Sequence, residues 1–291
     1  MSPFFSKIFK PVISLASIIG IPITPKKNTV DMSKFELTFC DDFDGNELNK
    51  NVWTAHLGCD EKNTLVRHGG YWNSSLAEVS DGCLKIKTKY LENGVNEGDA
   101  PGWYTAALDT SDSFRQKFGY FEVRAKCPKH SGQWAAFWLF DWAMTEVTGN
   151  GENGAEIDIM ESAFFGKKII KDRASHCVHY DGYDFPAHKS TVARQYKVLG
   201  NAYDEFNTYA LEWNEDEYIF YINGRETYRT KFGKTSKIPE FIILSCEVGG
   251  KSGTPGMNWA GKSFKNTDKN VETEFVVDYV KAYQYKNLIE K

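Results

Sequence analysis

Basic charge is not in excess in this sequence of 291 residues. Lysine and arginine number 35 against 39 aspartate and glutamate residues, which gives a net charge of −4 at pH 7. Domains that bind nucleic acid carry a basic patch or stripe, so we expect no nucleic-acid partner.

Metal-ligand spacing is missing as well. The six cysteines form no CxxC pair and stand at no His/Cys spacing typical of zinc, which argues against a zinc site. Their even number permits disulfides, but buried cysteines in a chain of this length commonly serve as small core residues. We therefore expect free thiols at Cys40, Cys59, Cys83, Cys127, Cys177 and Cys246.

Long hydrophobic runs are scarce. The run Val12–Ile21 holds about ten mostly apolar residues behind two lysines, whereas a membrane-spanning helix needs about 20. It fits the apolar region of a signal peptide, but prolines follow where small residues should mark a cleavage site. Residues 1–30 are thus either a signal- or anchor-like segment or an uncleaved extension packed on the domain, and we place the fold in 31–291.

Helical periodicity is also scarce, and short alternating segments take its place. Asn223-Gly224 is a strong signal for a β-hairpin. No repeat, low-complexity tract or linker divides residues 31–291, so we predict one all-β domain, a sandwich or a barrel. The segments expected to form strands include 83–88, 119–126, 134–140, 209–213, 218–222, 241–244 and 275–283.

Aromatic residues, in contrast, are abundant, with 8 Trp, 15 Tyr and 20 Phe. Most of them must pack in strand cores, because aromatic rings favour pleated, half-buried surfaces. A few exposed rings would stack on the apolar faces of sugars.

Three carboxylates stand together at Glu156, Asp158 and Glu161, with no basic residue among them. Apolar residues alternate with the first two, which predicts a half-buried strand with Glu156 and Asp158 on one face. Glu161 is an odd step further on and would turn to the other face. A β-bulge at Ile159-Met160 would return it, and bulges are frequent beside active sites.

Like charges on one face repel and raise at least one carboxyl pKa. A glycosidase needs this condition, because one carboxylate attacks while another stays protonated as the general acid. A retaining enzyme holds the two carboxyls about 5–5.5 Å apart, which requires a concave sheet here. A solvated strand face and a calcium site are the alternatives that the spacing leaves open.

Several stretches around this motif resemble glycoside hydrolase family 16, the group of laminarinases, agarases and lichenases, in its bulged E-x-D-x-x-E branch. The resemblance covers nearly everything after the N-terminal segment. It is carried by 39–45, 118–126 with Gly-Tyr-Phe-Glu-Val-Arg-Ala, 133–139 with Trp-Ala-Ala-Phe-Trp-Leu, 206–213 with Phe-Asn-Thr-Tyr-Ala-Leu-Glu-Trp, and 277–283.

This resemblance implies a concanavalin A-like β-jelly-roll, a sandwich of two curved antiparallel sheets with a substrate cleft across the concave face. It implies Glu156 as nucleophile, Glu161 as acid/base, and Asp158 as the residue that shares a proton with Glu156 or orients it. His179, rather than His176, matches the strand histidine near the acid/base.

The resemblance also suggests residues that contact the sugar chain. Trp134 and Trp138 match platforms near the scissile bond, with core packing open for one of them. Weaker candidates lie in loops that the family places along the cleft rims: Arg67, Tyr71, Trp72, Asn73 and Trp103, with Trp259 and Glu247 as others. Glu247 departs from the family pattern, because laminarinases usually carry an apolar residue there.

A structural calcium is the one metal that the resemblance suggests. Its ligands would be Asp42, the Gly45 carbonyl and Asp278 on the convex side, where Asp42 replaces a more usual Glu. No cofactor is expected for catalysis.

The function implied is a retaining endo-β-glycosidase that hydrolyses a polysaccharide, with a β-1,3- or β-1,3/1,4-glucan as the first expectation. A β-galactan of the agarose or porphyran type and a transglycosylase are alternatives. A non-catalytic carbohydrate-binding jelly roll is the alternative of another class. We expect a monomer that acts outside the cell or on its surface, because a polymer cannot cross a membrane; a cytoplasmic location is the alternative.

Overall fold

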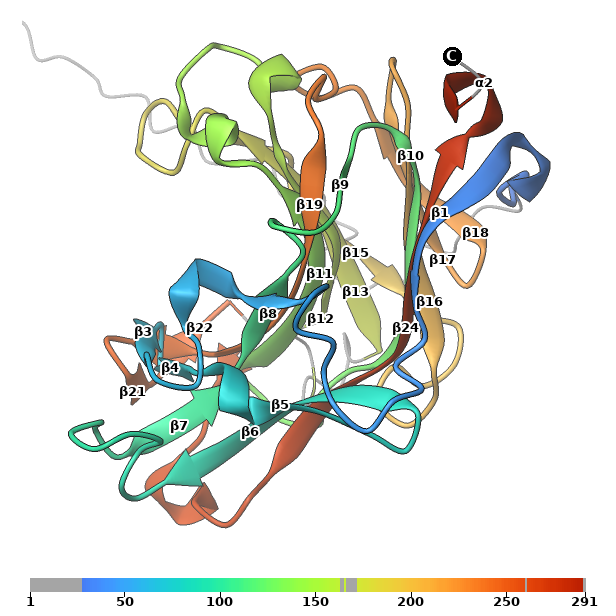
Figure 1. The fold of residues 1–291 in the computed structure, drawn as a ribbon. Helices are drawn as coiled ribbons and strands as arrows, with labels where there is room; N and C mark the ends of the chain where they lie inside the picture. The colour runs from blue at the N-terminus through green and yellow to red at the C-terminus, as the bar shows by residue number, and fades with distance from the viewer. Residues whose placement is uncertain (1–27, 163–164, 166–171, 260, 290–291) are drawn as a thin grey trace, which may run out of the picture.

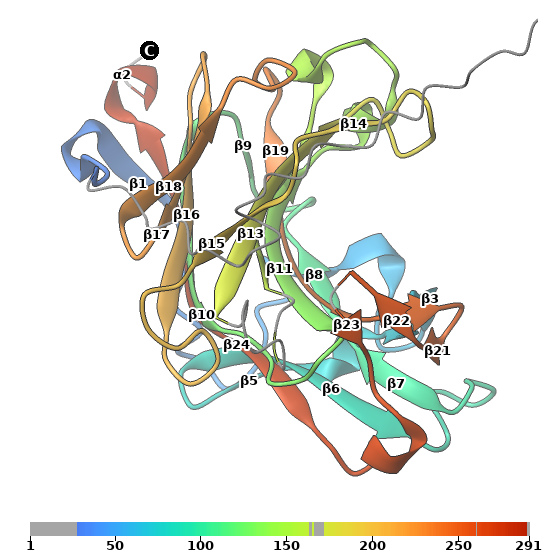
Figure 2. The ribbon, with the colours of Figure 1, turned by 180° about the vertical axis from the view of Figure 1, so that it is seen from behind.

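The computed structural model describes residues 28–162, 165, 172–259 and 261–289, so most of the N-terminal segment 1–30 lies outside the described residues. Two large curved sheets pack face to face, which confirms the predicted sandwich (Figures 1 and 2). The pairing is antiparallel throughout both sheets except between β4 and β7.

One of the two sheets, which we call the outer sheet, runs in the order β18 (Arg225–Thr230), β17 (Tyr218–Ile222), β16 (Asn207–Trp213), β10 (Gly119–Lys126), β24 (Thr273–Tyr285), β6 (Cys83–Leu91), β7 (Gly102–Thr105), β4 (Gly70–Trp72) and β3 (Leu65–Arg67). In addition, β1 (Phe35–Asp41) pairs with β24, and β5 (Ala77–Ser80) pairs with β6. The second sheet, which carries the acidic motif, runs in the order β14 (Lys189–Ser190), β13 (Arg173–Tyr180), β12 (Glu156–Ser162), β11 (Gln133–Phe140), β19 (Glu240–Val248), β8 (Ala107–Asp109) and β2 (Thr54–Ala55), with β15 (Arg194–Lys197) beside β13 and β9 (Arg115–Gln116) beside β19.

Two small hairpins complete the strands: β20 (Gly250–Lys251) with β21 (Thr254–Pro255), and β22 (Met257–Asn258) with β23 (Gly261–Lys262). Helical structure among the described residues is limited to short 3₁₀ turns and the four-residue α2 (Lys286–Ile289). None of these helices is long and apolar enough to cross a membrane. The 3₁₀ turns are Met32–Lys34, His56–Gly58, Ser74–Leu76, Trp142–Thr145, Gly151–Asn153 and Asn266–Asp268.

The core lies between the two sheets and follows from the alternation of side chains along each strand. On β10, Phe121 and Val123 are fully buried and face the second sheet. On β11, Phe137 and Leu139 face back into the same core. The intervening residues of β11 must therefore point to the opposite, outward face of the second sheet.

The predicted hairpin at Asn223-Gly224 is confirmed. Both residues have positive φ, at 50° and 69°, and they join β17 to β18. Asn and Gly tolerate this left-handed backbone, which matches the twist of paired strands.

The predicted bulge on β12 is also confirmed. Phe137 pairs with Met160 and Trp138 pairs with Asp158, so Ile159 is an extra residue opposite β11. On the other side, the β13 register shifts between Asp158 and Glu161. Ile159 and Met160 both enter the core, which returns Glu161 to the face of Glu156 and Asp158.

Candidate active site

The outward face of the second sheet holds a cleft of about 390 Å³. Alternate residues of three adjacent strands form its floor, because every second side chain of a strand shares a face. Loops between strands supply the remaining walls. The lining residues are Trp134, Ala136, Trp138 and Phe140 from β11, Glu156, Asp158 and Glu161 from β12, Ser245 and Glu247 from β19, and His56, Leu57, Arg67, His68, Trp142 and Tyr183 from β3 and the loops.

All three predicted carboxylates line this cleft, and burial dominates their electrostatics. Desolvation, followed by the charge of Asp158, raises the pKa of Glu156 to about 7. Desolvation raises the pKa of Asp158 to about 7 as well. For Glu161 the pKa is raised well above its ordinary value, again by desolvation first and by Asp158 second.

The raised pKa values have a chemical use in this cleft. Burial raises the pKa of Glu156 to about 7 and that of Glu161 well above its ordinary value, so both carboxyls hold protons at a pH where surface glutamates are ionised. A carboxyl that stays protonated serves as a general acid, and its ionised neighbour serves as a nucleophile. The arrangement thus supports the predicted roles of Glu156 and Glu161.

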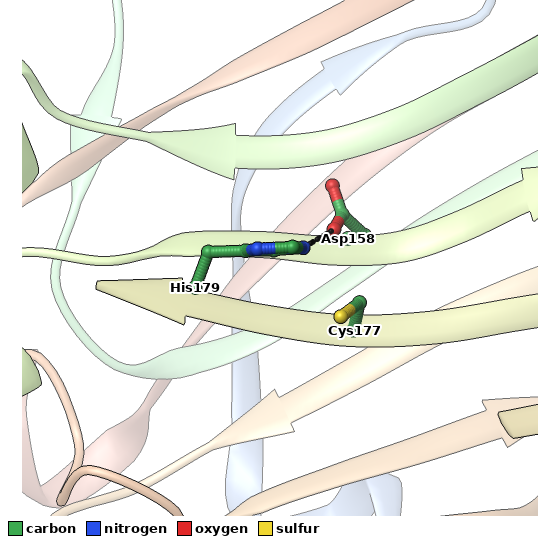
Figure 3. Close-up of side chains that lie close together, drawn as sticks. All are labelled: Asp158, Cys177 and His179. Carbon is green, nitrogen blue, oxygen red and sulfur yellow. Dashed lines mark ion pairs between the residues drawn. The ribbon is translucent and has the colours of Figure 1, made fainter. Parts of the chain in front are cut away.

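His179 on β13 points at the carboxylates, as Figure 3 shows for Asp158. Its Nε2 lies 3.3 Å from Asp158 Oδ2 and 3.8 Å from Glu156 Oε1. Its Nδ1 lies 2.9 Å from Nε2 of His188, and the two rings stack with centroids 5.1 Å apart. His176, in contrast, is fully buried in the core, between the Ile159 carbonyl and the Thr227 hydroxyl.

The thiol of Cys177 also lies beside this group, because Cys177 pairs with Asp158 across β12 and β13. One ligand atom each of Asp158, Cys177 and His179 lie within 4.8 Å of one another. Desolvation raises the pKa of the Cys177 thiol, which donates to the Thr191 carbonyl at 3.4 Å. A protonated thiol is a poor metal ligand, and we assign no metal here.

Both platform tryptophans face the cleft, and the structure adds a third. Trp134 packs on Trp259 with ring centroids 5.4 Å apart, and Trp259 is 47% exposed. Trp138 donates its indole N–H to Ser245 Oγ at 3.2 Å. Trp142, which the sequence did not single out, is 49% exposed and lines the cleft beyond Trp138.

Glu247 lies in the cleft floor, as its departure from the family pattern suggested. Its Oε1 accepts from Arg67 Nη2 at 2.9 Å, while Oε2 has no hydrogen-bond partner among the described residues. Desolvation raises the pKa of Glu247 to about 7, against the opposing charge of Arg67. The Arg67 guanidinium also lies 4.3 Å from the centre of the Trp72 ring.

Three predicted rim residues are wrong as cleft residues. Trp103 is buried against Phe264, with stacked rings 3.7 Å apart. Trp72 is buried and donates its indole N–H to the Cys246 carbonyl. Asn73 is fully buried and caps the 3₁₀ turn Ser74–Leu76, accepting from Ser75 N at 3.0 Å. Each of them fills a packing or capping role, so none is available to a sugar.

The two carboxylates among the predicted calcium ligands are paired with basic side chains. Asp42 pairs with Lys281 at 2.9 Å, and Asp278 pairs with Arg124. Because each carboxylate already has its own cation, this set does not fit a calcium ion in the arrangement described. Calcium stays a prediction that metal titration would test.

All six cysteines are free, and five of them are buried, in keeping with the expected role as core residues. Of the cleft residues that the sequence did not indicate, Ser245 has a simple signal, because it stands two positions before Glu247 on β19. His56, His68, Trp142 and Tyr183 come from turns and loops, which no periodicity describes.

The curved sandwich, and the glutamates that its bulged strand brings into the cleft, place the protein among the glycoside hydrolases, and the chain belongs to family 16 of that class. Within the family, the model that matches is the GH16 domain of β-porphyranases A–D, over residues 35–285.

The chain is also similar to two curated proteins and to a solved structure. It is 26% identical over 273 residues to the endo-1,3-1,4-β-glycanase ExsH of Rhizobium meliloti, which covers 88% of this chain and 53% of that protein. It is 24% identical over 286 residues to a β-glucanase of Rhodothermus marinus, covering 93% of each. The laminarinase catalytic domain of Thermotoga petrophila superposes with a TM-score of 0.66 at 23% identity, covering 87% of this chain and 98% of that one. The chain thus spans about half the length of ExsH.

Proposed function

We propose that the protein is a retaining endo-β-glycosidase of polysaccharides. The observation that carries this proposal is the β12 bulge, which brings Glu156 and Glu161 to one face of the cleft floor, where burial raises the pKa of both. An open cleft flanked by tryptophans suits a chain that is cut internally, because flat rings stack on sugar faces.

In the first step, Glu156 attacks the anomeric carbon while Glu161 donates its proton to the glycosidic oxygen, and the leaving chain departs as an alcohol. In the second step, Glu161 removes a proton from water, which attacks the glycosyl–Glu156 ester with net retention. Asp158 lies between them and shares a proton with Glu156, which spreads the charge of the pair.

For the substrate, a β-1,3- or β-1,3/1,4-glucan is the first candidate. It is supported by the activities for which ExsH and the Rhodothermus β-glucanase are named, and the second of these proteins matches this chain over 93% of both lengths.

A porphyran-type galactan is the second candidate, and a specific feature favours it. The matching family model is that of β-porphyranases. Among the described residues that line the cleft, Arg67 is the one with a permanent positive charge, and it lies beside Glu247 where laminarinases usually carry an apolar residue. A guanidinium suits the sulfate ester of such a chain.

Product release from laminarin, mixed-linkage glucan, porphyran, agarose and carrageenan tests both candidates, with Glu156→Gln and Glu161→Gln beside the wild type. We expect release from one class of polymer, lost in both variants, with the β-anomer formed first in proton NMR. Products longer than the substrate would indicate transglycosylation. Binding without release by the wild type would overturn the proposal in favour of a carbohydrate-binding jelly roll.

We further propose that the protein is a monomer that acts outside the cell or on its surface, because its polymeric substrate cannot enter. Activity assayed separately in medium, surface and lysate fractions tests the location. Light scattering tests the oligomeric state.

A further inference from the structure

One loop contacts the nucleophile side of the site from outside the sheet. It spans Asp181–His188 and joins β13 to β14 (Figure 2 shows the two strands). Its base is firmly held: the buried Asp181 accepts backbone N–H groups of Thr148 and Gly149 at 2.8 and 3.0 Å, and Gly182 N–H donates to the Met144 carbonyl at 2.8 Å.

Two side chains of this loop reach the catalytic carboxylates by separate routes. The Tyr183 hydroxyl donates directly to Glu156 Oε2. His188 contacts His179 Nδ1, and the opposite nitrogen of His179 faces Asp158. The loop therefore reaches both members of the carboxylate pair, although it contributes no carboxylate of its own to the cleft lining.

We propose that the loop Asp181–His188 positions the nucleophile, with Tyr183 fixing Glu156 directly and His188 fixing the ring of His179. This proposal rests on the proposed glycosidase function. Tyr183 and His188 are positioning residues in this scheme, since they act on Glu156 and His179 and not on the reacting sugar atoms.

The physical basis is the stabilisation of a buried carboxylate in one orientation. A hydrogen bond to the charged form of an acid favours that form, and it restricts the rotation of the side chain. Around Glu156, burial and Asp158 favour the neutral acid, while His179, Tyr183 and Arg67 favour the carboxylate. Of these three partners, Tyr183 donates a direct hydrogen bond to Glu156, whereas His179 Nε2 lies 3.8 Å from Glu156 Oε1.

Removal of the Tyr183 hydroxyl has a defined consequence. Without its donor, Glu156 ionises at higher pH, and the nucleophile must be ionised to attack. The acidic limb of the kcat/KM profile reports the pKa of this group in the free enzyme. Tyr183→Phe is therefore expected to move that limb to higher pH and to lower kcat/KM at neutral pH by about 10- to 100-fold.

The matched control is Tyr279→Phe. Tyr279 on β24 also donates its hydroxyl to a carboxylate, Glu122 Oε1 at 2.8 Å, but in the outer sheet. This variant loses the same type of bond and should keep the wild-type profile. His188→Ala should lower activity in the same direction as Tyr183→Phe, by a smaller factor, because it acts through His179.

A second measurement separates this proposal from the proposed function. Carbon NMR of protein labelled at the glutamate carboxyls, with Glu156 assigned by Glu156→Gln, follows the ionisation of Glu156 without any substrate. A higher Glu156 pKa in Tyr183→Phe, with no change in Tyr279→Phe, supports the positioning role even if no polymer in the panel is cleaved. An unchanged Glu156 pKa in Tyr183→Phe overturns it, even if the enzyme is active.

Discussion

At the scale of single residues, burial is the force that sets the chemistry of this cleft. Glu156, Asp158, Glu161 and Glu247 each have a raised pKa whose first cause is desolvation. Charge repulsion, which the sequence suggested as the cause, comes second for Glu156 and Glu161. The resulting site holds protons that ordinary surface carboxylates have lost at neutral pH.

The first prediction concerns the pH profile of the wild type. Because Glu156 must be ionised and its pKa is about 7, activity should rise through an acidic limb near pH 7. The alkaline limb should follow the ionisation of Glu161, whose pKa burial raises well above its ordinary value. Initial rates from pH 4 to 10 on the best polymer check this, and full activity at pH 5 would contradict it.

The second prediction concerns Glu240, a fully buried carboxyl whose Oε1 accepts from Ala155 N at 3.0 Å, directly before strand β12. Desolvation raises its pKa to about 8. The folded protein therefore keeps a proton that the unfolded chain loses above about pH 4.3, so this residue lowers stability progressively from about pH 4.3 to 8.

Glu240→Gln removes this titration and keeps the acceptor for Ala155. We expect the difference in the free energy of unfolding, variant minus wild type, to increase by about 1–3 kcal/mol from pH 5 to pH 8.5. Urea unfolding at both pH values measures the change. The control is Glu272→Gln, because Glu272 is exposed. If the free energy of unfolding depended on pH equally in Glu240→Gln and in wild type, the prediction would be wrong.

At the scale of elements, β12 is the part that sequence reasoning described best. The alternation Glu156-Ile157-Asp158 fixes two faces, and the odd step to Glu161 requires an extra residue, so strand and bulge both follow from spacing. The same logic on β11 placed Trp134 and Trp138 together on the cleft side.

The periodicity of the sequence did not predict where side chains at the cleft rim and in loops would lie. Trp72 and Trp103 were placed in loops on the cleft rim by resemblance, yet they lie in strands β4 and β7, and their rings are buried. Tyr183 was missed because its contact with Glu156 depends on how the bonds at Asp181 and Gly182 direct the chain. Such long-range contacts leave no periodic trace in a sequence.

The third prediction tests the bulge itself. Deletion of Ile159 restores a regular strand, in which Met160 faces the core and Glu161 still faces the cleft. We expect a folded protein with lowered activity, destabilised by about 2–4 kcal/mol through the loss of one buried side chain.

Insertion of alanine between Met160 and Glu161 is the opposite change, because it turns Glu161 toward the core. That variant should be inactive and strongly destabilised, since it buries an unpaired carboxyl. Thermal unfolding measures the stability of both variants, and polymer hydrolysis measures their activity. Equal activity of the deletion and insertion variants would mean that activity does not depend on the sheet face to which Glu161 points.

At the scale of the whole molecule, a large core joins both sheets, and five of the six thiols are buried, two of them, Cys127 and Cys246, in that core. The fourth prediction follows from this distribution. A thiol reagent should modify one cysteine, Cys40, in the native protein and all six in denaturant.

The reaction at Cys40 should be slow at neutral pH and faster in alkali, because desolvation and Asp42 raise the pKa of its thiol to about 11. Absorbance of the released chromophore gives the count. Cys40→Ser should abolish native labelling, and labelling of a second thiol before unfolding would contradict the burial described.

Strand β12 presents Glu156 and Glu161 on one side and Ile157, Ile159 and Met160, each fully buried, on the other. The carboxyls proposed to react are therefore anchored to a buried strand, and buried strands are among the last parts of a folded domain to open. Amide hydrogens of this strand should exchange with solvent only through global unfolding. Loss of catalysis in denaturant should then coincide with loss of the fold, and the enzyme should pass through no folded, inactive state on the way.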